Sequence, residues 1–176
     1  YGSVMALGQV RLKLVIAWST VAQVGYLFLV FPLAGGGGAE AVPAGAWTAG
    51  VLHAISHATA KAAMFLAAGL VIERIGHDRV AGLSGLARAM PATVLAFALA
   101  GVTLMGLPPS GGFVAKYLWL TAAVAGERPL LAAVPVVGGL LAALYLFRPL
   151  TVMLARPEAD ASPGPVRPRE LLPLAL

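Results

Sequence analysis

Long apolar stretches, separated by short polar segments, dominate the hydrophobic pattern of this chain. Four of them are long enough to cross a hydrocarbon core, which needs about 20 apolar residues: 14–33, 44–72, 91–125 and 130–147. The glycine run Gly35–Gly38 indicates a flexible loop between the first two stretches. The pattern therefore predicts an all-α integral membrane protein with about four transmembrane helices.

The third stretch contains a helix-breaking segment near its middle. Adjacent prolines cannot continue a helix, because they lack backbone donors and clash with the preceding turn. We therefore expect two half-helices, at about 91–105 and 113–125, joined by an unwound loop that must be buried in protein or lie beside a cavity. A proline kink or a re-entrant hairpin is the alternative. The residues that break the helix are Gly106, Pro108, Pro109, Gly111 and Gly112.

The composition agrees with a membrane protein. Of the 176 residues, 60% are hydrophobic and 11% are charged, whereas a soluble domain carries about 25% charged residues. A soluble enzyme, a disordered tail and a nucleic-acid-binding module are therefore excluded, although the net charge is +5. Cysteine is absent, which excludes disulfides, iron–sulfur ligation and thiol chemistry within this sequence.

The ends of the sequence indicate an internal fragment. It starts without a methionine and finishes in a short apolar run at 171–176. We expect residues 1–155 to form one transmembrane domain. Residues 156–176 would form a solvated linker, rich in proline and charge, and the start of a further, truncated helix.

Lysine and arginine are distributed unevenly between the two sides of the predicted topology. Arg128 stands alone on one side, while Lys61 and Lys116 lie inside spans. The positive-inside rule then places both ends of the fragment in the cytoplasm, and a composition rich in alanine, glycine and arginine suggests a bacterial inner membrane. A weak attraction to anionic lipid headgroups would be a secondary effect. The nine basic residues on the other side are Arg11, Lys13, Arg74, Arg79, Arg88, Arg148, Arg156, Arg167 and Arg169.

The second stretch carries three ionisable residues, His53, His57 and Lys61, at a spacing of four residues. On a helix they drift by only about 40° per step and form one polar stripe about 12 Å long. Ser56 and Thr59 supply hydroxyl groups nearby. Lys61 lies too deep to reach the interface, so it must face the protein interior or a water-filled cavity. Groups of this kind, placed a water molecule apart, are the parts of a proton relay.

Other interpretations of these residues stay open. A histidine in a helix is ordinarily a packing residue, which is the alternative for His53. Two histidines four residues apart could share a metal ion, but no Cys, Asp or Glu nearby completes a ligand set, and Lys61 would repel a cation. Lys116 falls in the first turn of the second half-helix, where the helix dipole opposes a cation. Four residues could support the relay: Lys13, Gln23, Ser56 and Thr59. Of these, Lys13 is expected instead to be an interface anchor.

Aromatic residues are spread over the apolar stretches. Tryptophan and tyrosine favour the membrane–water interface, so they are candidates for an interfacial belt. These candidates are Trp18, Tyr26, Trp47, Tyr117, Trp119 and Tyr145.

Three motifs in order resemble one known family. Residues 13–26 are similar to K-x-x-x-A-[YW]-S-[ST]-x-x-Q-x-G-Y, residues 53–69 to H-x-x-x-H-A-x-x-K-x-x-x-F-L-x-x-G, and residues 106–116 to G-x-P-P-x-x-G-F-x-x-K. The family comprises the antiporter-like, proton-translocating membrane subunits of respiratory complex I (NADH-quinone oxidoreductase). Its relatives occur in multisubunit cation/proton antiporters and membrane-bound hydrogenases.

The resemblance implies a fold and a role. The full subunit of that family has two inverted repeats, each with one broken helix, and this fragment is similar to most of the second. Lys61 would be the central relay lysine, with His57 and His53 beside it, and Lys116 would pass protons to the non-cytoplasmic side. The chain would carry no cofactor or redox centre of its own. Other membrane subunits would be its partners in the bilayer, and a redox complex would supply the energy.

Two alternatives accompany this interpretation. A subunit of a cation/proton antiporter or hydrogenase could move Na⁺ or K⁺ against protons, but no Asp or Glu lies within the four predicted spans to bind such an ion. A structural anchor subunit would need neither lysine for transport. The sequence alone does not identify which of these complexes contains the chain or which ion is coupled to proton movement.

Overall fold

The computed structural model describes residues 1–35, 41–156 and 168–176, with the backbone alone at 41–43. Within these ranges every element is helical, apart from one isolated bridge between Arg11 and Arg79. The elements are α1 (Gly2–Leu7), α2 (Leu12–Leu27), α3 (Val30–Ala34), α4 (Ala41–Ile75), η1 (Val80–Gly82), α5 (Leu86–Ala89), α6 (Pro91–Met105), α7 (Gly111–Ala125), α8 (Pro129–Leu154) and η2 (Pro168–Ala175).

The predicted all-α membrane architecture is confirmed. Three helical segments are long and apolar enough to cross a membrane: Leu12–Ala34, Ala44–Ile75 and Pro129–Leu154. The third predicted span is divided into α6 and α7, which are 15 residues each. α8 continues past the predicted end at 147, although Pro149 lies inside it, because the buried proline packs in the bundle and the helix tolerates the missing donor.

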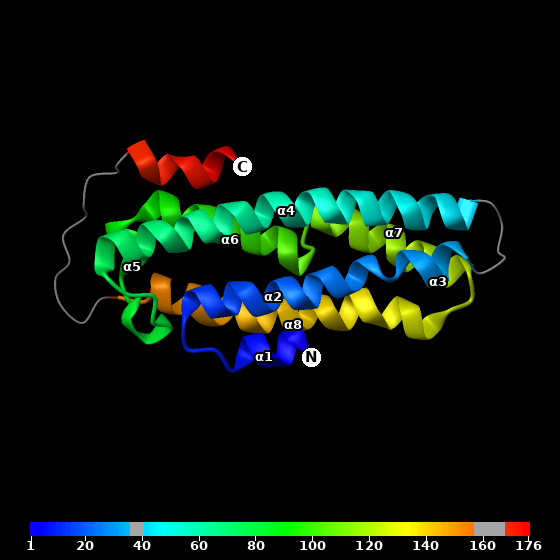
Figure 1. Ribbon diagram of the computed structural model, residues 1–176, viewed down its shortest axis with the longest axis horizontal. Coiled ribbons are helices and arrows are strands. Elements are labelled where there is room, and N and C mark those ends of the chain that lie inside the picture. The colour runs from blue at the N-terminus through cyan, green and yellow to red at the C-terminus, as the bar shows by residue number, and fades with distance from the viewer. Residues whose placement is uncertain (36–40, 157–167) are drawn as a thin grey trace.

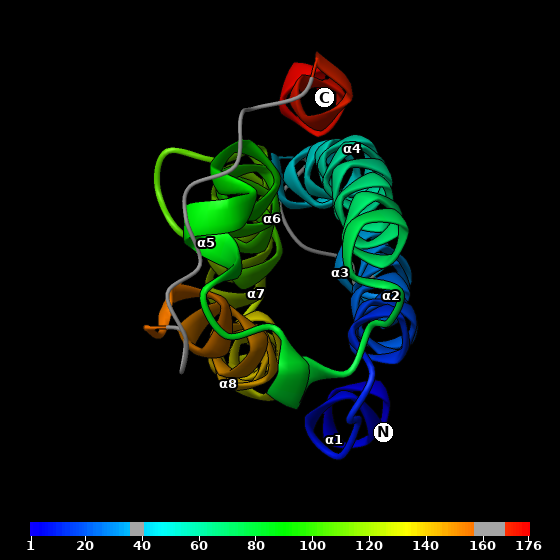
Figure 2. The ribbon, with the colours of Figure 1, turned by 90° about the vertical axis from the view of Figure 1, so that its left-hand side faces the viewer.

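The helices form an elongated bundle, in which α6 and α7 follow one another along the length of α4 (Figure 1). Seen from its end, the bundle places α2 beside α4 and α8 beside α6 and α7 (Figure 2). Small side chains on α4, such as Ala60, Ala63 and Ala67, are buried and allow its neighbours to approach closely.

Two apolar clusters divide the interior along the bundle axis. One contains Leu12, Met64 and Phe97, and the other contains Tyr26 and Trp119. Several buried polar and charged residues lie within or beside these clusters. They include Ser19, Gln23, His53, Lys61 and Lys116.

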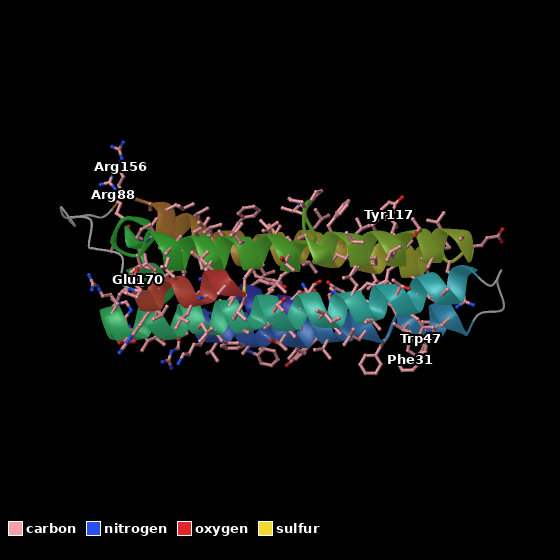
Figure 3. All side chains as sticks on the ribbon, turned by 90° about the horizontal axis from the view of Figure 1, so that it is seen from above. Phe31, Trp47, Arg88, Tyr117, Arg156 and Glu170 are labelled. Atoms are coloured by element: carbon pink, nitrogen blue, oxygen red, sulfur yellow. The ribbon has the colours of Figure 1, made fainter. Side chains whose placement is uncertain are left out.

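One end of the bundle is strongly basic. The start of α2, the end of α4, the start of α6 and the end of α8 all meet there (Figure 1). Arg128 precedes α8 at the opposite end. Figure 3 places Arg88 and Arg156 at the basic end and shows Phe31, Trp47 and Tyr117 pointing outward from the helices. The basic residues at this end among those described are Arg11, Lys13, Arg74, Arg79, Arg88, Arg148, Arg156 and Arg169.

Parts of two predicted segments lie outside the described residues. These are most of the glycine loop, from 36 to 40, and most of the linker, from 157 to 167. The tail that follows, at 168–175, forms the 3-10 helix η2, which packs against α4 and α6. The division into a domain at 1–155 and a linker at 156–176 stays a prediction.

Candidate proton-transfer site

The predicted break between two half-helices is present. α6 ends at Gly106, whose positive φ of 78° ordinary residues rarely adopt. The backbone N–H groups of Gly106 and Leu107 donate to the carbonyl of Val102, which closes the last turn. α7 begins at Gly111, earlier than predicted, because the hydroxyl of Ser110 accepts a hydrogen bond from the Phe113 N–H at 3.1 Å and caps the helix.

Glycine is required where the two half-helices cross. A Cβ atom on Gly112 would collide with the carbonyl oxygen of Thr103 in α6. A Cβ on Gly111 would likewise meet the hydroxyl of Ser56 in α4. The glycines thus bring the start of α7 against both α6 and α4, which positions the residues that follow on α7.

Lys116 reaches back across the break. Its ammonium donates to the carbonyls of Leu104, at 2.8 Å, and Met105, at 3.0 Å, in the last turn of α6. These carbonyls are left free by the helix end and carry the negative end of its dipole. The expectation that a helix N-terminus opposes this charge is corrected: Lys116 is the sixth residue of α7, and its ammonium contacts the C-terminal end of α6. The same nitrogen lies 5.5 Å from the centre of the Tyr26 ring.

Lys61 is held by α2. Its ammonium donates to the carbonyl of Ile16 at 2.7 Å and to the hydroxyl of Ser19. The residue is 7% exposed, so it faces the protein interior. Ser19 in turn donates to the same carbonyl at 2.8 Å. Both lysines therefore lie inside the bundle on uncharged oxygen atoms.

The two histidines lie between the lysines. The rings of His53 and His57 are stacked, with their centres 5.8 Å apart and their planes 18° from parallel. Nε2 of His53 lies 3.1 Å from the carbonyl oxygen of Gln23. Nδ1 of His53 and both ring nitrogens of His57 have no hydrogen-bond partner among the described residues.

Three further polar side chains lie between the lysines. Gln23 is predicted from the sequence as a possible supporting residue of the relay, whereas Ser19 and Tyr145 are not. Gln23 is fully buried, and its Nε2 donates to the Leu104 carbonyl at 2.9 Å, the oxygen that also accepts from Lys116. The same Nε2 lies 3.5 Å from the hydroxyl of Tyr145, and Ser19 lies close to that hydroxyl. A line of polar groups thus runs from Lys61 through Ser19, Tyr145 and Gln23 to the Leu104 carbonyl, which also accepts from Lys116.

The aromatic residues divide between two environments. Trp47 and Tyr117 are exposed, which an interfacial aromatic belt requires. Tyr26, Trp119 and Tyr145 are buried, so the belt interpretation is wrong for them. The signal available in the sequence was the hydroxyl group of Tyr145 within a long apolar helix, because a buried hydroxyl needs a partner.

The remaining predicted residues are less central. Ser56 lies against the start of α7, while the Thr59 hydroxyl bonds the Ile55 and Ser56 carbonyls within its own helix. Lys13 is exposed at the basic end, away from the two buried lysines. Among the described residues, no three His, Cys, Asp or Glu side chains gather closely enough to hold a metal ion.

Comparison with known proteins decides the family. The model of the family described as NADH:quinone oxidoreductase/Mrp antiporter, transmembrane, matches residues 1–142. The chain belongs to this family. It is 36% identical, over its full length, to NADH-quinone oxidoreductase subunit N of Desulforudis audaxviator, and covers 35% of that protein. It is 35% identical to subunit L of Pseudomonas aeruginosa, with 90% of the chain aligned to 25% of the relative.

Solved structures agree with this family membership. A chain in the Mrp complex from Dietzia sp. DQ12-45-1b is 31% identical, with a TM-score of 0.80 over 92% of this chain and 29% of that one. A chain of respiratory complex I from Thermus thermophilus shares the fold, with a TM-score of 0.77 at 20% identity. The present sequence spans about a third of its relatives or less, so it covers part of a larger antiporter-like membrane subunit.

Proposed function

We propose that this chain translocates protons across the membrane through His53, His57, Lys61 and Lys116. It would do so as part of an antiporter-like subunit of an NADH-quinone oxidoreductase-type complex. The observation that carries the proposal is the polar line that joins the two lysines within an otherwise apolar bundle. Burying an ionisable residue at membrane depth is energetically costly, so its presence there indicates a function.

The geometry suggests how each lysine works. Lys61 would release a proton to the histidine pair, whose unpartnered ring nitrogens can take it up, or to the hydroxyl of Ser19. Lys116 would receive it and hold the charge on the carbonyls that end α6. The link between them would run through Tyr145 and Gln23, or through water beside the histidines.

The energy must come from outside this chain. Moving one charge across a membrane against 100 mV costs about 2.3 kcal/mol. The family relatives are subunits of multisubunit complexes, as their names state. We therefore propose other membrane subunits as partners and a redox reaction in the parent complex as the driving force. The electron transfer itself would use no residue of this chain.

Proton uptake by proteoliposomes that contain the intact parent complex tests the proposal. A pH-sensitive dye follows uptake after addition of the electron donor. We expect Lys61→Met to abolish uptake while the complex assembles normally. Lys13→Met is the matched control, because Lys13 is an exposed lysine outside the polar line, and it should pump as the wild type does. Normal pumping by Lys61→Met would refute the relay and favour a structural anchor.

A cation/proton antiporter subunit is the second candidate. The likeness to a chain of the Mrp complex favours it. Of the described carboxylates, Glu73 and Glu170 lie beside the apolar helices but at the basic end of the bundle, away from the lysines. An antiporter would acidify or alkalinise the vesicles after a Na⁺ or K⁺ pulse without an electron donor, whereas the favoured function requires the donor.

A further inference from the structure

A polar pocket of about 610 Å³ opens at the basic end of the bundle. It lies where the segment before α2 meets the connection between α4 and α5. Three arginines line it, Arg11, Arg79 and Arg148, together with His77 and Asp78. The pocket lies apart from the polar line between Lys61 and Lys116.

A backbone bridge holds two of these arginines side by side. The Leu12 N–H donates to the Asp78 carbonyl at 2.7 Å, and the Val80 N–H donates to the Val10 carbonyl at 2.9 Å. Arg11 and Arg79 are therefore the directly opposed, non-hydrogen-bonded pair of an antiparallel bridge. In such a pair both side chains leave from the same face and lie close together. Like charges placed this way repel each other, unless an anion lies between or beside them.

Among the residues that line the pocket, Asp78 is the single carboxylate beside the three arginines. Asp78 is buried, and its oxygens accept from Nε of Arg11 at 2.9 Å and from the N–H of Lys13 at 3.4 Å. Burial alone would raise the pKa of Asp78, but these hydrogen bonds outweigh it and lower the pKa, so the carboxylate stays charged. Asp78 therefore fixes Arg11 and neutralises one positive charge.

The other two arginines have no carboxylate partner among the described residues. The guanidinium of Arg79 has no hydrogen bond or ion pair with any residue in the described ranges. Arg148 donates to the carbonyls of Leu7, at 2.7 Å, and Gln9, at 3.0 Å, which are uncharged acceptors. These bonds hold its side chain at the pocket without cancelling its charge. Two positive charges thus remain uncompensated in a pre-formed cavity.

The pocket lies at the ends of two apolar helices, where the headgroup region of a membrane would begin. Leu12 is the first residue of α2 and Ile75 is the last of α4, so the residues around the bridge sit at the ends of two apolar helices. Guanidinium groups match phosphate oxygens in geometry as well as charge. We propose that this pocket binds a phosphate group, supplied by the headgroup of an anionic phospholipid or by free phosphate.

Lipid binding to the purified full-length subunit tests the site. Native mass spectrometry would measure binding of phosphatidylglycerol, with phosphatidylcholine as the zwitterionic comparison. We expect Arg79→Gln to weaken phosphatidylglycerol binding about fivefold, the effect of one basic residue near a headgroup. Arg88→Gln is the control, because Arg88 is exposed at the same end but does not line the pocket, and it should bind as the wild type does.

Three further results decide between outcomes. Arg79→Lys should recover part of the affinity, which a folding defect in Arg79→Gln would not explain. Competition by millimolar inorganic phosphate would identify free phosphate as the ligand, and its absence would identify the lipid headgroup. Equal phosphatidylglycerol affinity in Arg79→Gln, Arg88→Gln and the wild type, with no binding of inorganic phosphate, would overturn the proposal.

Discussion

The buried lysines share a chemical setting that a pattern of residue types does not reveal. Each ammonium rests on backbone carbonyls of a neighbouring helix, Ile16 for Lys61 and Leu104 with Met105 for Lys116. Neither has a carboxylate partner among the described residues. Acceptors of this kind hold a charged amine without trapping it in an ion pair, as the proposed relay requires.

The candidate residues were predictable from sequence only where spacing carries the signal. The stripe of His53, His57 and Lys61 follows from helical periodicity. Ser19 and Tyr145 lie 126 residues apart in the sequence, and α8 is apolar on nearly every face, so no periodicity indicates which side of α8 meets α2. Their contact belongs to tertiary packing, which the sequence pattern alone does not specify.

Removal of the Tyr145 hydroxyl tests the link between the lysines. In Tyr145→Phe the contacts with Gln23 and Ser19 are lost, while the ring still fills its place. A hydrogen bond contributes about 0.5–1.5 kcal/mol net, so we expect proton pumping to slow by roughly two- to tenfold. The rate of dye quenching in proteoliposomes measures this. Tyr117→Phe, which alters an exposed tyrosine, should leave the rate unchanged. Equal rates in both variants would mean that protons pass beside the histidines instead.

At the scale of elements, local chemistry determines the broken helix. Glycine, two prolines and a capping serine fall within a few residues, so the end of α6 was predicted to the residue and the start of α7 to within two. The fourth span was predicted to end at residue 147, but α8 continues to Leu154 with the buried Pro149 inside it. Helix boundaries set by residues within one turn can therefore be predicted from the sequence. Boundaries that depend on packing against other helices cannot.

The crossing of α6 and α7 depends on a glycine. We expect Gly112→Ala to destabilise the subunit by about 1–3 kcal/mol, because the added methyl group collides with the Thr103 carbonyl and must push the half-helices apart. Thermal unfolding of the purified full chain in detergent measures the effect. Gly69→Ala is the control, since a Cβ there has open space. A melting temperature of Gly112→Ala equal to that of Gly69→Ala would contradict the close contact.

The whole molecule carries its charge asymmetrically. The helix ends that meet at one end of the bundle carry nearly all the exposed lysine and arginine residues. The even number of crossings and this charge bias were both predictable, because they depend on span length and composition alone. The packing of η2 on α4 and α6 was not, because a short segment with little regular pattern does not specify its contact surface.

The charge asymmetry predicts the orientation in the membrane. The sequence contains no cysteine, so single cysteines introduced into the full subunit on a cysteine-free background can report accessibility. Ala81→Cys at the basic end should react with a membrane-impermeant maleimide only after the cells are permeabilised. Ala125→Cys, at the exposed end of α7, should react in intact cells. The reverse labelling pattern would place the basic end outside.

The carbonyl oxygen of Leu104 accepts hydrogen bonds from both Gln23 and Lys116. Such an oxygen has two lone pairs, so these two donors use its full capacity. A small sliding movement of α2 that stretches the bond to Gln23 leaves more electron density for the ammonium of Lys116. A displacement of α2 and the hydrogen bonding of Lys116 on α7 therefore meet at one oxygen atom of α6.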